Sequence, residues 1–128
     1  MSGATISPRI LVIDDNYMSV ESLRGMLQGA GMQIVGPALS LAGALELGAA
    51  PGRIDAAIVD LDLHGEASLP AIDVLLERGV PVMLLTGYDV SVLPARYRQL
   101  PHCQKPIMAS LVLQQVARLI DRRDGATA

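Results

Sequence analysis

The sequence predicts an α/β fold built on one parallel sheet of five strands with helices on both faces. Short apolar runs alternate with longer segments of helical period, and parallel strands need such crossovers to connect them. The runs are continuously apolar, which is typical of strands covered on both faces. With 128 residues the chain has the length of one domain, and we expect a single domain over residues 1–128 with its core at about 8–123.

The first strand and the helix after it are indicated by their apolar residues. Ile10–Ile13 is an apolar run of the length of a buried strand. Asn16 is placed to cap a helix, apolar side chains recur at helical spacing over Val20–Leu27, and Gly31 marks the end of this helix. A brief second strand follows at Gln33–Val35.

The middle of the chain repeats the same pattern. Ser40 is placed to cap the second helix, which ends before Pro51 and Gly52. Ala56–Val59 is an apolar run that predicts the third strand. The third helix is expected over Leu69–Arg78.

The last part of the chain contains two further strands. Val82–Leu85 predicts the fourth strand, and His102–Gln104 a short fifth strand. Between them, Asp89–Leu100 is a weaker helical segment because Pro94 interrupts it, and we expect this segment to be the most mobile part of the fold. A strong helix over about Ile107–Arg122 closes the fold.

The last predicted helix carries a stripe of apolar residues that is wider than one buried face needs. Its members are Leu111, Val112, Leu113, Val116, Leu119 and Ile120. We expect part of this stripe to contact a partner or to form a homodimer. The alternative is that neighbouring elements cover all of it.

Composition and charge exclude several classes of function. The net charge is −3 and the pI is near 5.2, so no basic patch for nucleic acid is evident. The N-terminal residues lack the apolar segment of a signal peptide, and no apolar run approaches the length of a membrane span, so we expect a cytoplasmic protein with no membrane contact. The single cysteine, Cys103, allows no internal disulfide and is expected to be a small core residue, and zinc-ligand spacing is missing.

Polar residues follow four of the predicted strands. Asp14 and Asp15 follow the first strand, Asp60 the third, Thr86 the fourth and Lys105 the fifth. In open α/β sheets ligands bind at the carboxyl ends of the strands, so we expect these side chains to converge on one edge. A single acid after a strand is more often a turn residue or a cap, and it is the ordered set that favours a functional site.

The predicted cluster of three carboxylates needs positive charge to offset their repulsion. Magnesium suits such a site because it prefers oxygen ligands and keeps several waters. Asp60 is then able to act as a nucleophile toward a phosphoryl group, with Lys105 neutralising its oxygens and Thr86 donating a hydroxyl. Asp62 is either a solvated loop acid or lends its backbone carbonyl to the metal, and His64 is expected to be exposed.

The motifs "IDD", "VDLD", "LLTG" and "QKP" together resemble the receiver domain of two-component response regulators, over essentially the whole chain. The resemblance implies a flavodoxin-like (βα)5 fold with its phosphoacceptor at Asp60 and supporting roles for Thr86 and Lys105. It also implies a cis peptide bond before Pro106.

The same resemblance implies a cofactor and partners. Mg²⁺ would be held by Asp14, Asp15 and Asp60 together with the backbone carbonyl of Asp62. The phosphoryl donor would be a phosphohistidine on a sensor histidine kinase or a histidine phosphotransfer protein. The chain would then be a self-phosphorylating receiver with slow autodephosphorylation, not a turnover enzyme, and would signal through a downstream protein partner because no output domain follows the last helix.

One residue departs from the receiver pattern at the position of the switch aromatic. His102 stands where receivers usually carry a switch aromatic, three residues before the lysine. We therefore expect Tyr88, which follows "LLTG", to take part in the switch, with His102 as the second candidate.

Two alternative functions remain open. "DLDLHG" also reads as the Asp-x-Asp motif of haloacid-dehalogenase-like phosphatases, with Asp60 as nucleophile and Asp62 as general acid. In that family the motif follows the first strand, and the Asp14 and Asp15 pair would have no role. The other alternative is a non-phosphorylated pseudo-receiver that only binds a partner, which the complete acidic set disfavours.

Overall fold

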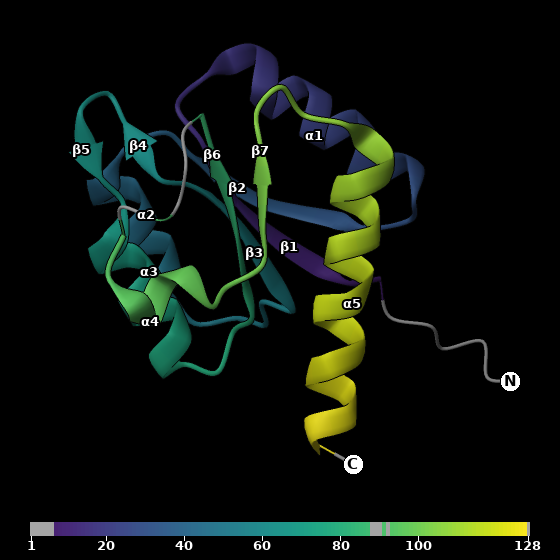
Figure 1. The fold of residues 1–128 in the computed structure, drawn as a ribbon. Helices are drawn as coiled ribbons and strands as arrows, with labels where there is room; N and C mark the ends of the chain where they lie inside the picture. Colours follow the sequence, from purple (N-terminus) through teal and green to yellow (C-terminus); the bar gives the residue numbers. More distant parts are fainter. Residues whose placement is uncertain (1–6, 88–90, 92, 128) are drawn as a thin grey trace, which may run out of the picture.

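A five-stranded parallel sheet forms the centre of the fold in the computed structural model, which describes residues 7–87, 91 and 93–127 (Figure 1). The strands are β1 (Arg9–Ile13), β2 (Gln33–Ala38), β3 (Ala56–Asp60), β6 (Val82–Thr86) and β7 (His102–Gln104). They lie in the order β2-β1-β3-β6-β7, and every neighbouring pair is parallel. This is the flavodoxin-like order, with its switch point between β1 and β3. The predicted fold class is therefore confirmed.

In the part of the chain that the structure describes, five helices connect or follow these strands. They are α1 (Tyr17–Gly29), α2 (Leu41–Ala49), α3 (Leu69–Glu77), α4 (Ala95–Arg98) and α5 (Ala109–Thr127). Both predicted caps are present: the Asn16 side chain accepts a hydrogen bond of 3.0 Å from the backbone N–H of Ser19, and Ser40 accepts one of 3.1 Å from Gly43. The last helix begins at Ala109, two residues later than predicted.

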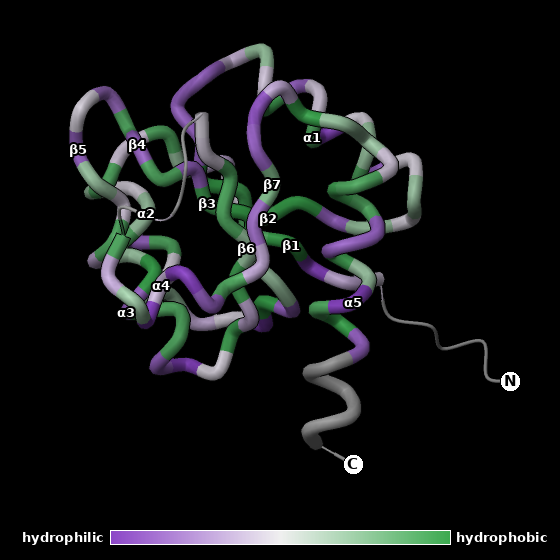
Figure 2. Tube along the Cα trace, viewed as in Figure 1, coloured by the Kyte–Doolittle hydropathy of each residue, from purple (hydrophilic) through white to green (hydrophobic). Residues whose placement is uncertain are grey.

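The helices cover the sheet on both faces (Figures 1 and 2). Helices α1 and α5 pack on one face, where Ile10 and Val12 of β1 point, and α2, α3 and α4 pack on the other, where Leu11 and Ile13 point. Every residue of β3 and β6 is buried. This two-sided burial explains why the strands are continuously apolar in the sequence.

A short hairpin that was not predicted follows β3. Its strands are β4 (Asp62–Leu63) and β5 (Glu66–Ala67), and they pair antiparallel. Strand β2 also extends beyond the predicted end at Val35 and includes Pro37, which an edge strand tolerates because it has no partner on one side. Both differences arise where the sequence carries turn residues.

The weak helical segment predicted over Asp89–Leu100 contains the four-residue helix α4. Pro94 is its N-cap, and its carbonyl accepts hydrogen bonds from the N–H groups of Tyr97 (3.0 Å) and Arg98 (3.3 Å). Residues 88–90 and 92 lie outside the described residues. The expected mobility of this segment stays a prediction.

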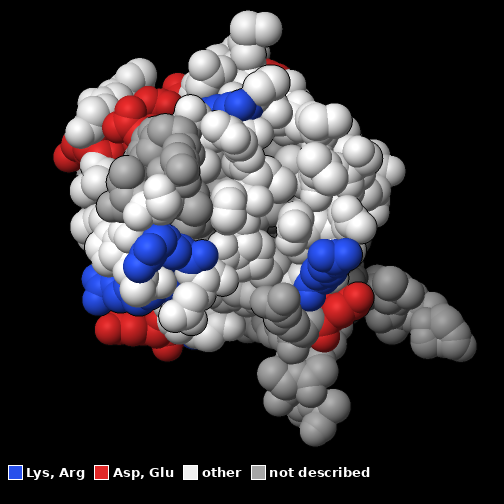
Figure 3. Space-filling model, viewed as in Figure 1, with Lys and Arg blue, Asp and Glu red and all other residues white. Residues whose placement is uncertain are grey.

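Most of the apolar stripe on α5 faces the sheet. Five of its six side chains are buried or half-buried, and the sixth, Leu111, is 46% exposed. Figure 3 shows charged side chains of both signs scattered over one face, with acidic ones near the hairpin β4–β5 and basic ones near α4. Among the described residues, no helix combines the length and apolar character that a membrane crossing requires.

Candidate functional site

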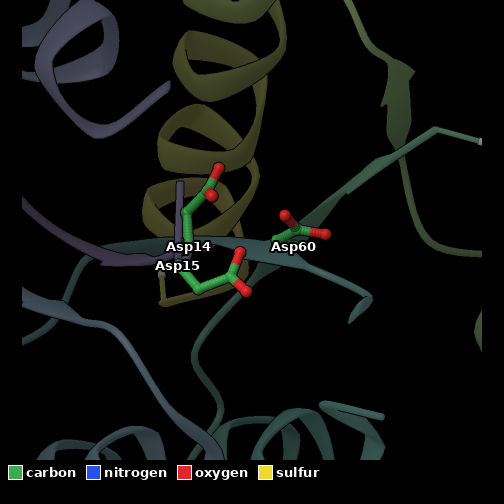
Figure 4. Close-up of side chains that lie close together, drawn as sticks. All are labelled: Asp14, Asp15 and Asp60. Atoms are coloured by element: carbon green, nitrogen blue, oxygen red, sulfur yellow. The ribbon is translucent and has the colours of Figure 1, made fainter. Parts of the chain in front are cut away.

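The polar residues predicted at the strand ends meet at one edge of the sheet. Asp14 and Asp15 follow β1, Asp60 is the last residue of β3, Thr86 is the last residue of β6, and Lys105 follows β7. Because these four strands are consecutive neighbours in the sheet, their carboxyl ends lie side by side. Figure 4 shows the three aspartates, two from the end of β1 and one from β3, clustered at this edge.

The three aspartates form a tight acidic cluster. One carboxylate oxygen from each of Asp14, Asp15 and Asp60 lies within 4.8 Å of the other two. Asp14 is fully buried, and Asp60 is also buried. Burial raises the pKa of Asp14, with a further contribution from the charge of Asp60, while a hydrogen bond from Asn16 and the charge of Lys105 oppose the rise. The cluster is therefore electrostatically costly.

One buried oxygen of the cluster lacks a hydrogen bond. Asp14 Oδ1 accepts one of 2.9 Å from the backbone N–H of Asn16, but Oδ2 has no hydrogen-bond partner. The Nζ atom of Lys105 lies 3.3 Å from Oδ2, where the two groups form an ion pair. Buried polar atoms are normally satisfied, and a cation at this edge would satisfy this one.

Lys105 supplies positive charge to the cluster. Its Nζ atom donates a hydrogen bond of 2.8 Å to Asp60 Oδ2, and its backbone N–H donates one of 2.7 Å to the carbonyl of Thr86. Burial acts to lower the pKa of Lys105, but the hydrogen bond to Asp60 and the charges of Asp14 and Asp60 outweigh it, so the pKa lies above its ordinary value. Lys105 is therefore an ammonium at neutral pH. The peptide bond between Lys105 and Pro106 is cis, as the resemblance implied.

The hairpin β4–β5 forms one wall of the site. The backbone N–H of Asp62 donates a hydrogen bond of 3.1 Å to Asp60 Oδ1, and the exposed Asp62 carboxylate accepts one of 3.0 Å from Gly65. His64, at the turn, is exposed as expected, yet its Nδ1 atom lies 3.1 Å from Asp15 Oδ2. Sequence reasoning missed this contact. The metal-binding role of the Asp62 carbonyl stays a prediction.

A cavity of about 370 Å³ opens at this edge. Its lining residues are Asp15, Asn16, Asp60, Asp62, His64, Gly87 and Lys105. Thr86 is buried beside it at the end of β6, and its predicted hydroxyl donation stays a prediction. The cavity is polar and open enough to admit a phosphoryl group together with a hydrated cation.

Of the two candidate switch residues, the structure describes only His102. Tyr88 lies outside the described residues. His102 is exposed at the start of β7, where it pairs with Leu84, and it lines a second cavity of about 270 Å³ together with Met108 and Leu111. Their roles in a switch stay predictions. Cys103, next to His102, is half-buried against the core on the α5 side, so it is less buried than predicted.

Tyr97 of α4 is a buried side chain that the sequence analysis did not single out. It is 1% exposed within the core on the α2–α3 side, and its hydroxyl donates a hydrogen bond shared between the two carboxylate oxygens of Asp73 of α3, at 2.9 and 3.1 Å. The guanidinium of Arg96 contacts both the Tyr97 hydroxyl and the Asp73 carboxylate. Helix α4, although short, is thereby attached to α3.

The donor set fits a magnesium ion. Three carboxylates converge from two adjacent strands, one buried carboxylate oxygen lacks a hydrogen bond, and the cavity next to them has room for water ligands. Oxygen ligands of this kind are those that Mg²⁺ prefers.

Comparisons with known proteins point to one family. No protein-family model matches the chain, and no curated protein sequence matches it. Among solved structures, SdrG from Sphingomonas melonis Fr1 is 32% identical, with a TM-score of 0.77, over 89% of this chain and 97% of that chain. The REC domain of the response regulator PhyR from Erythrobacter litoralis is 25% identical, with a TM-score of 0.79, over 92% and 93% of the two chains.

More distant structures share the fold. A CheY-like response regulator receiver domain protein from Methanospirillum hungatei JF-1 has a TM-score of 0.83 at 19% identity, over 94% of this chain and 99% of that chain. At that identity the likeness concerns the fold alone. Across these matches, each known chain is covered almost from end to end.

Proposed function

Because the chain belongs to the response regulator receiver domains of two-component signal transduction, we propose that Asp60 is its phosphoacceptor and that Mg²⁺ is its cofactor. The observation that carries this proposal is the contact between Asp60 and Lys105 inside a cluster of three strand-end carboxylates. A nucleophile, a fixed cation and a set of oxygen ligands for a metal thus lie in one cavity. These are the parts that phosphoryl transfer requires.

The proposed reaction transfers a phosphoryl group to a carboxylate oxygen of Asp60. The bond between phosphorus and the imidazole nitrogen of a phosphohistidine breaks as the bond from phosphorus to Asp60 forms, and the donor histidine leaves with the electron pair of the broken bond. The products are an acyl phosphate on this chain and a free histidine on the donor. Asp60 is suited to attack because it is 7% exposed, buried enough to be fixed but still part of the cavity wall.

Other side chains of the site stabilise the added charge. The Lys105 ammonium contacts Asp60, so it lies within reach of the phosphoryl oxygens once the group is attached to Asp60. The Thr86 hydroxyl is proposed to donate to one of these oxygens from the end of β6. Mg²⁺, held by Asp14, Asp15, Asp60 and the backbone carbonyl of Asp62, would supply positive charge to the carboxylates and to the transferring group.

The phosphatase alternative assigns Asp62 a catalytic role that its contacts do not favour. In that mechanism the Asp62 carboxylate must reach the leaving group, whereas it accepts a hydrogen bond from Gly65 within the hairpin turn. The pseudo-receiver alternative is disfavoured because Asp14, Asp15, Asp60 and Lys105 are all in place.

The proposed partners follow from the chemistry. The donor is a sensor histidine kinase or a histidine phosphotransfer protein in the cytoplasm, and the output passes to a downstream protein partner. A homodimer through α5 would use the exposed Leu111 and the neighbouring Met108, which is 59% exposed. Sedimentation of the protein with and without a phosphoryl mimic tests the homodimer, and a single monomeric species in both would contradict it.

The central experiment is incubation with acetyl phosphate and Mg²⁺ followed by intact-mass measurement. The wild type is expected to gain one phosphoryl group, and EDTA or Asp60→Asn should abolish the gain. Asp62→Asn is the matched control, because it makes the same chemical change two residues away and leaves the backbone carbonyl in place.

The two variants distinguish the receiver proposal from the phosphatase alternative. Asp62→Asn should keep phosphorylation under the receiver proposal, whereas the phosphatase alternative requires that it lose turnover. Stable phosphorylation of Asp60→Asn at the wild-type rate would overturn the assignment of Asp60. Rapid hydrolysis of a generic phosphate monoester by the wild type would favour the phosphatase.

A further inference from the structure

His64 stands at the rim of the acidic cluster, at the turn of the hairpin β4–β5. It occupies the turn between β4 and β5 with a φ of 52°, in the left-handed region that histidine adopts more readily than most residues. The hairpin around it is anchored, because Leu63 is buried and the backbone N–H of Ser68 donates a hydrogen bond of 3.0 Å to the carbonyl of Leu61. The imidazole is 81% exposed, so no other part of the described chain covers it.

The imidazole and the cluster lie at the spacing of two ligands on one ion. His64 Nδ1 is 3.1 Å from Asp15 Oδ2. At metal–ligand distances of about 2.1 Å, two adjacent ligand atoms of an octahedral ion lie about 3 Å apart. An oxygen of the same Asp15 lies within 4.8 Å of oxygens of Asp14 and Asp60. An ion that binds these carboxylates is therefore within reach of the imidazole.

The two ends of the cluster differ in chemistry. Lys105 contacts Asp14 and Asp60 and contributes positive charge there, whereas His64 contacts Asp15 and contributes a nitrogen donor. Magnesium prefers oxygen ligands and parts reluctantly with its water, but imidazole binds well to Ni²⁺, Zn²⁺ and related ions. A site with three carboxylates and one imidazole therefore distinguishes between these classes of metal.

We propose that His64 is a fourth side-chain ligand that Ni²⁺ and other nitrogen-preferring divalent ions recruit and Mg²⁺ does not. The inference rests on the metal site of the proposed function and concerns which ions that site accepts. With a nitrogen-preferring ion bound, the hairpin β4–β5 would be tied through His64 to the carboxylates that follow β1. With Mg²⁺ bound, the imidazole of His64 would stay outside the ligand set.

The test measures Ni²⁺ and Mg²⁺ affinities of the untagged protein by calorimetry. His64→Gly suits the left-handed backbone and removes the imidazole, while His64→Asn also suits it and keeps a polar group able to hydrogen-bond Asp15. Both variants are expected to lose about tenfold or more in Ni²⁺ affinity and less than about twofold in Mg²⁺ affinity. The matched control is His102→Ala, which removes the other histidine of the chain and should change neither affinity.

A second readout asks whether nitrogen is bound directly. Pulsed electron paramagnetic resonance of the Cu²⁺-loaded wild type should show coupling to the imidazole nitrogen of His64, since Cu²⁺ is a nitrogen-preferring ion, and this coupling should vanish in His64→Gly and persist in His102→Ala. Ni²⁺ affinity that is unchanged in His64→Gly would overturn the proposal. Equal losses for Ni²⁺ and Mg²⁺ would also overturn it, because His64 would then only position Asp15.

The metal site itself is tested separately. Asp14→Asn should weaken the binding of both ions, and a Ni²⁺ affinity that this substitution leaves unchanged would overturn the proposal by placing the ion outside the cluster. Failure of acetyl phosphate to modify Asp60 would instead count against the proposed function. That result would leave the comparison of Ni²⁺ and Mg²⁺ among the His64 variants intact.

Discussion

Asp14→Asn is expected to stabilise the metal-free protein, although it removes a fully buried side chain's charge from the centre of the site. Asparagine keeps an oxygen that can accept the hydrogen bond from the backbone N–H of Asn16, so the local backbone geometry is retained. What changes is the charge. Repulsion from Asp15 and Asp60 disappears, together with the attraction to Lys105.

The magnitude follows from the distances. At an effective dielectric constant of about 20, two like charges at the upper bound of 4.8 Å repel by about 3.5 kcal/mol, and two opposite charges 3.3 Å apart attract by about 5 kcal/mol. Loss of two repulsions and one attraction leaves a gain of about 2 kcal/mol in the free energy of unfolding. Relief of the cost of burying the Asp14 charge acts in the same direction.

Metal should reverse the order of stability. A ligand that binds only the folded state at about one hundred times its Kd stabilises it by about 2.7 kcal/mol. The wild type gains this stabilisation from Mg²⁺, whereas Asp14→Asn lacks one of the proposed ligands and gains less. We therefore expect the variant to be more stable than the wild type in EDTA and not in saturating Mg²⁺.

Urea denaturation followed by circular dichroism, in EDTA and in Mg²⁺, measures both differences. Asp73→Asn is the matched control, since it makes the same change at a carboxylate that bonds Tyr97 and Arg96 outside the cluster. It should not stabilise the protein, and its effect should not depend on Mg²⁺. A destabilised Asp14→Asn in EDTA, or the same difference between variant and wild type in both conditions, would refute the reasoning.

Three further predictions concern parts of the fold outside the acidic cluster. Tyr97→Phe removes the hydrogen bonds to Asp73 and should lower the free energy of unfolding by about 1 kcal/mol in urea denaturation; an unchanged midpoint would contradict it. Burial raises the pKa of Cys103, so the midpoint of its alkylation rate against pH should lie above that of the urea-unfolded chain, and coincident midpoints would count against this. Amide hydrogen exchange over 89–100 should be faster than in α5 and should change on phosphorylation; equal and unchanged protection would disprove the expected mobility.

The sheet was predictable because each strand carries its own signal. The apolar runs at Ile10–Ile13 and Ala56–Val59 are buried on both faces, and the polar residue that follows each run marks the strand end. Parallel connection then places those ends at one edge without knowledge of any contact. The juxtaposition of Asp14, Asp60 and Lys105 followed from this rule alone.

Features that depend on single turns or on tertiary contacts were not predictable. The strands β4 and β5 have two residues each, too few for any periodic pattern, so the hairpin and the contact between His64 and Asp15 gave no signal. Helix α4 has four residues, which is too short to define a buried face, so Tyr97 could not be assigned to the core. The extension of β2 past Pro37 depends on its place at the sheet edge.

The order of the strands has a consequence for how the chain folds. Strand β1 pairs with β2 on one side and β3 on the other, so three adjacent strands are complete once residue 60 is available. These strands already bring the carboxylates of Asp14, Asp15 and Asp60 together, whereas the ammonium that opposes their repulsion arrives only with the segment after β7. A partly folded state with only β1, β2 and β3 paired would therefore carry uncompensated negative charge. Docking of β7 against β6 would compensate this charge, because it brings the Lys105 ammonium to Asp14 and Asp60. Pairing of β7 with β6 thus brings a favourable electrostatic contribution that pairing among β1, β2 and β3 lacks, and this disfavours a stable partly folded state that contains only those three strands.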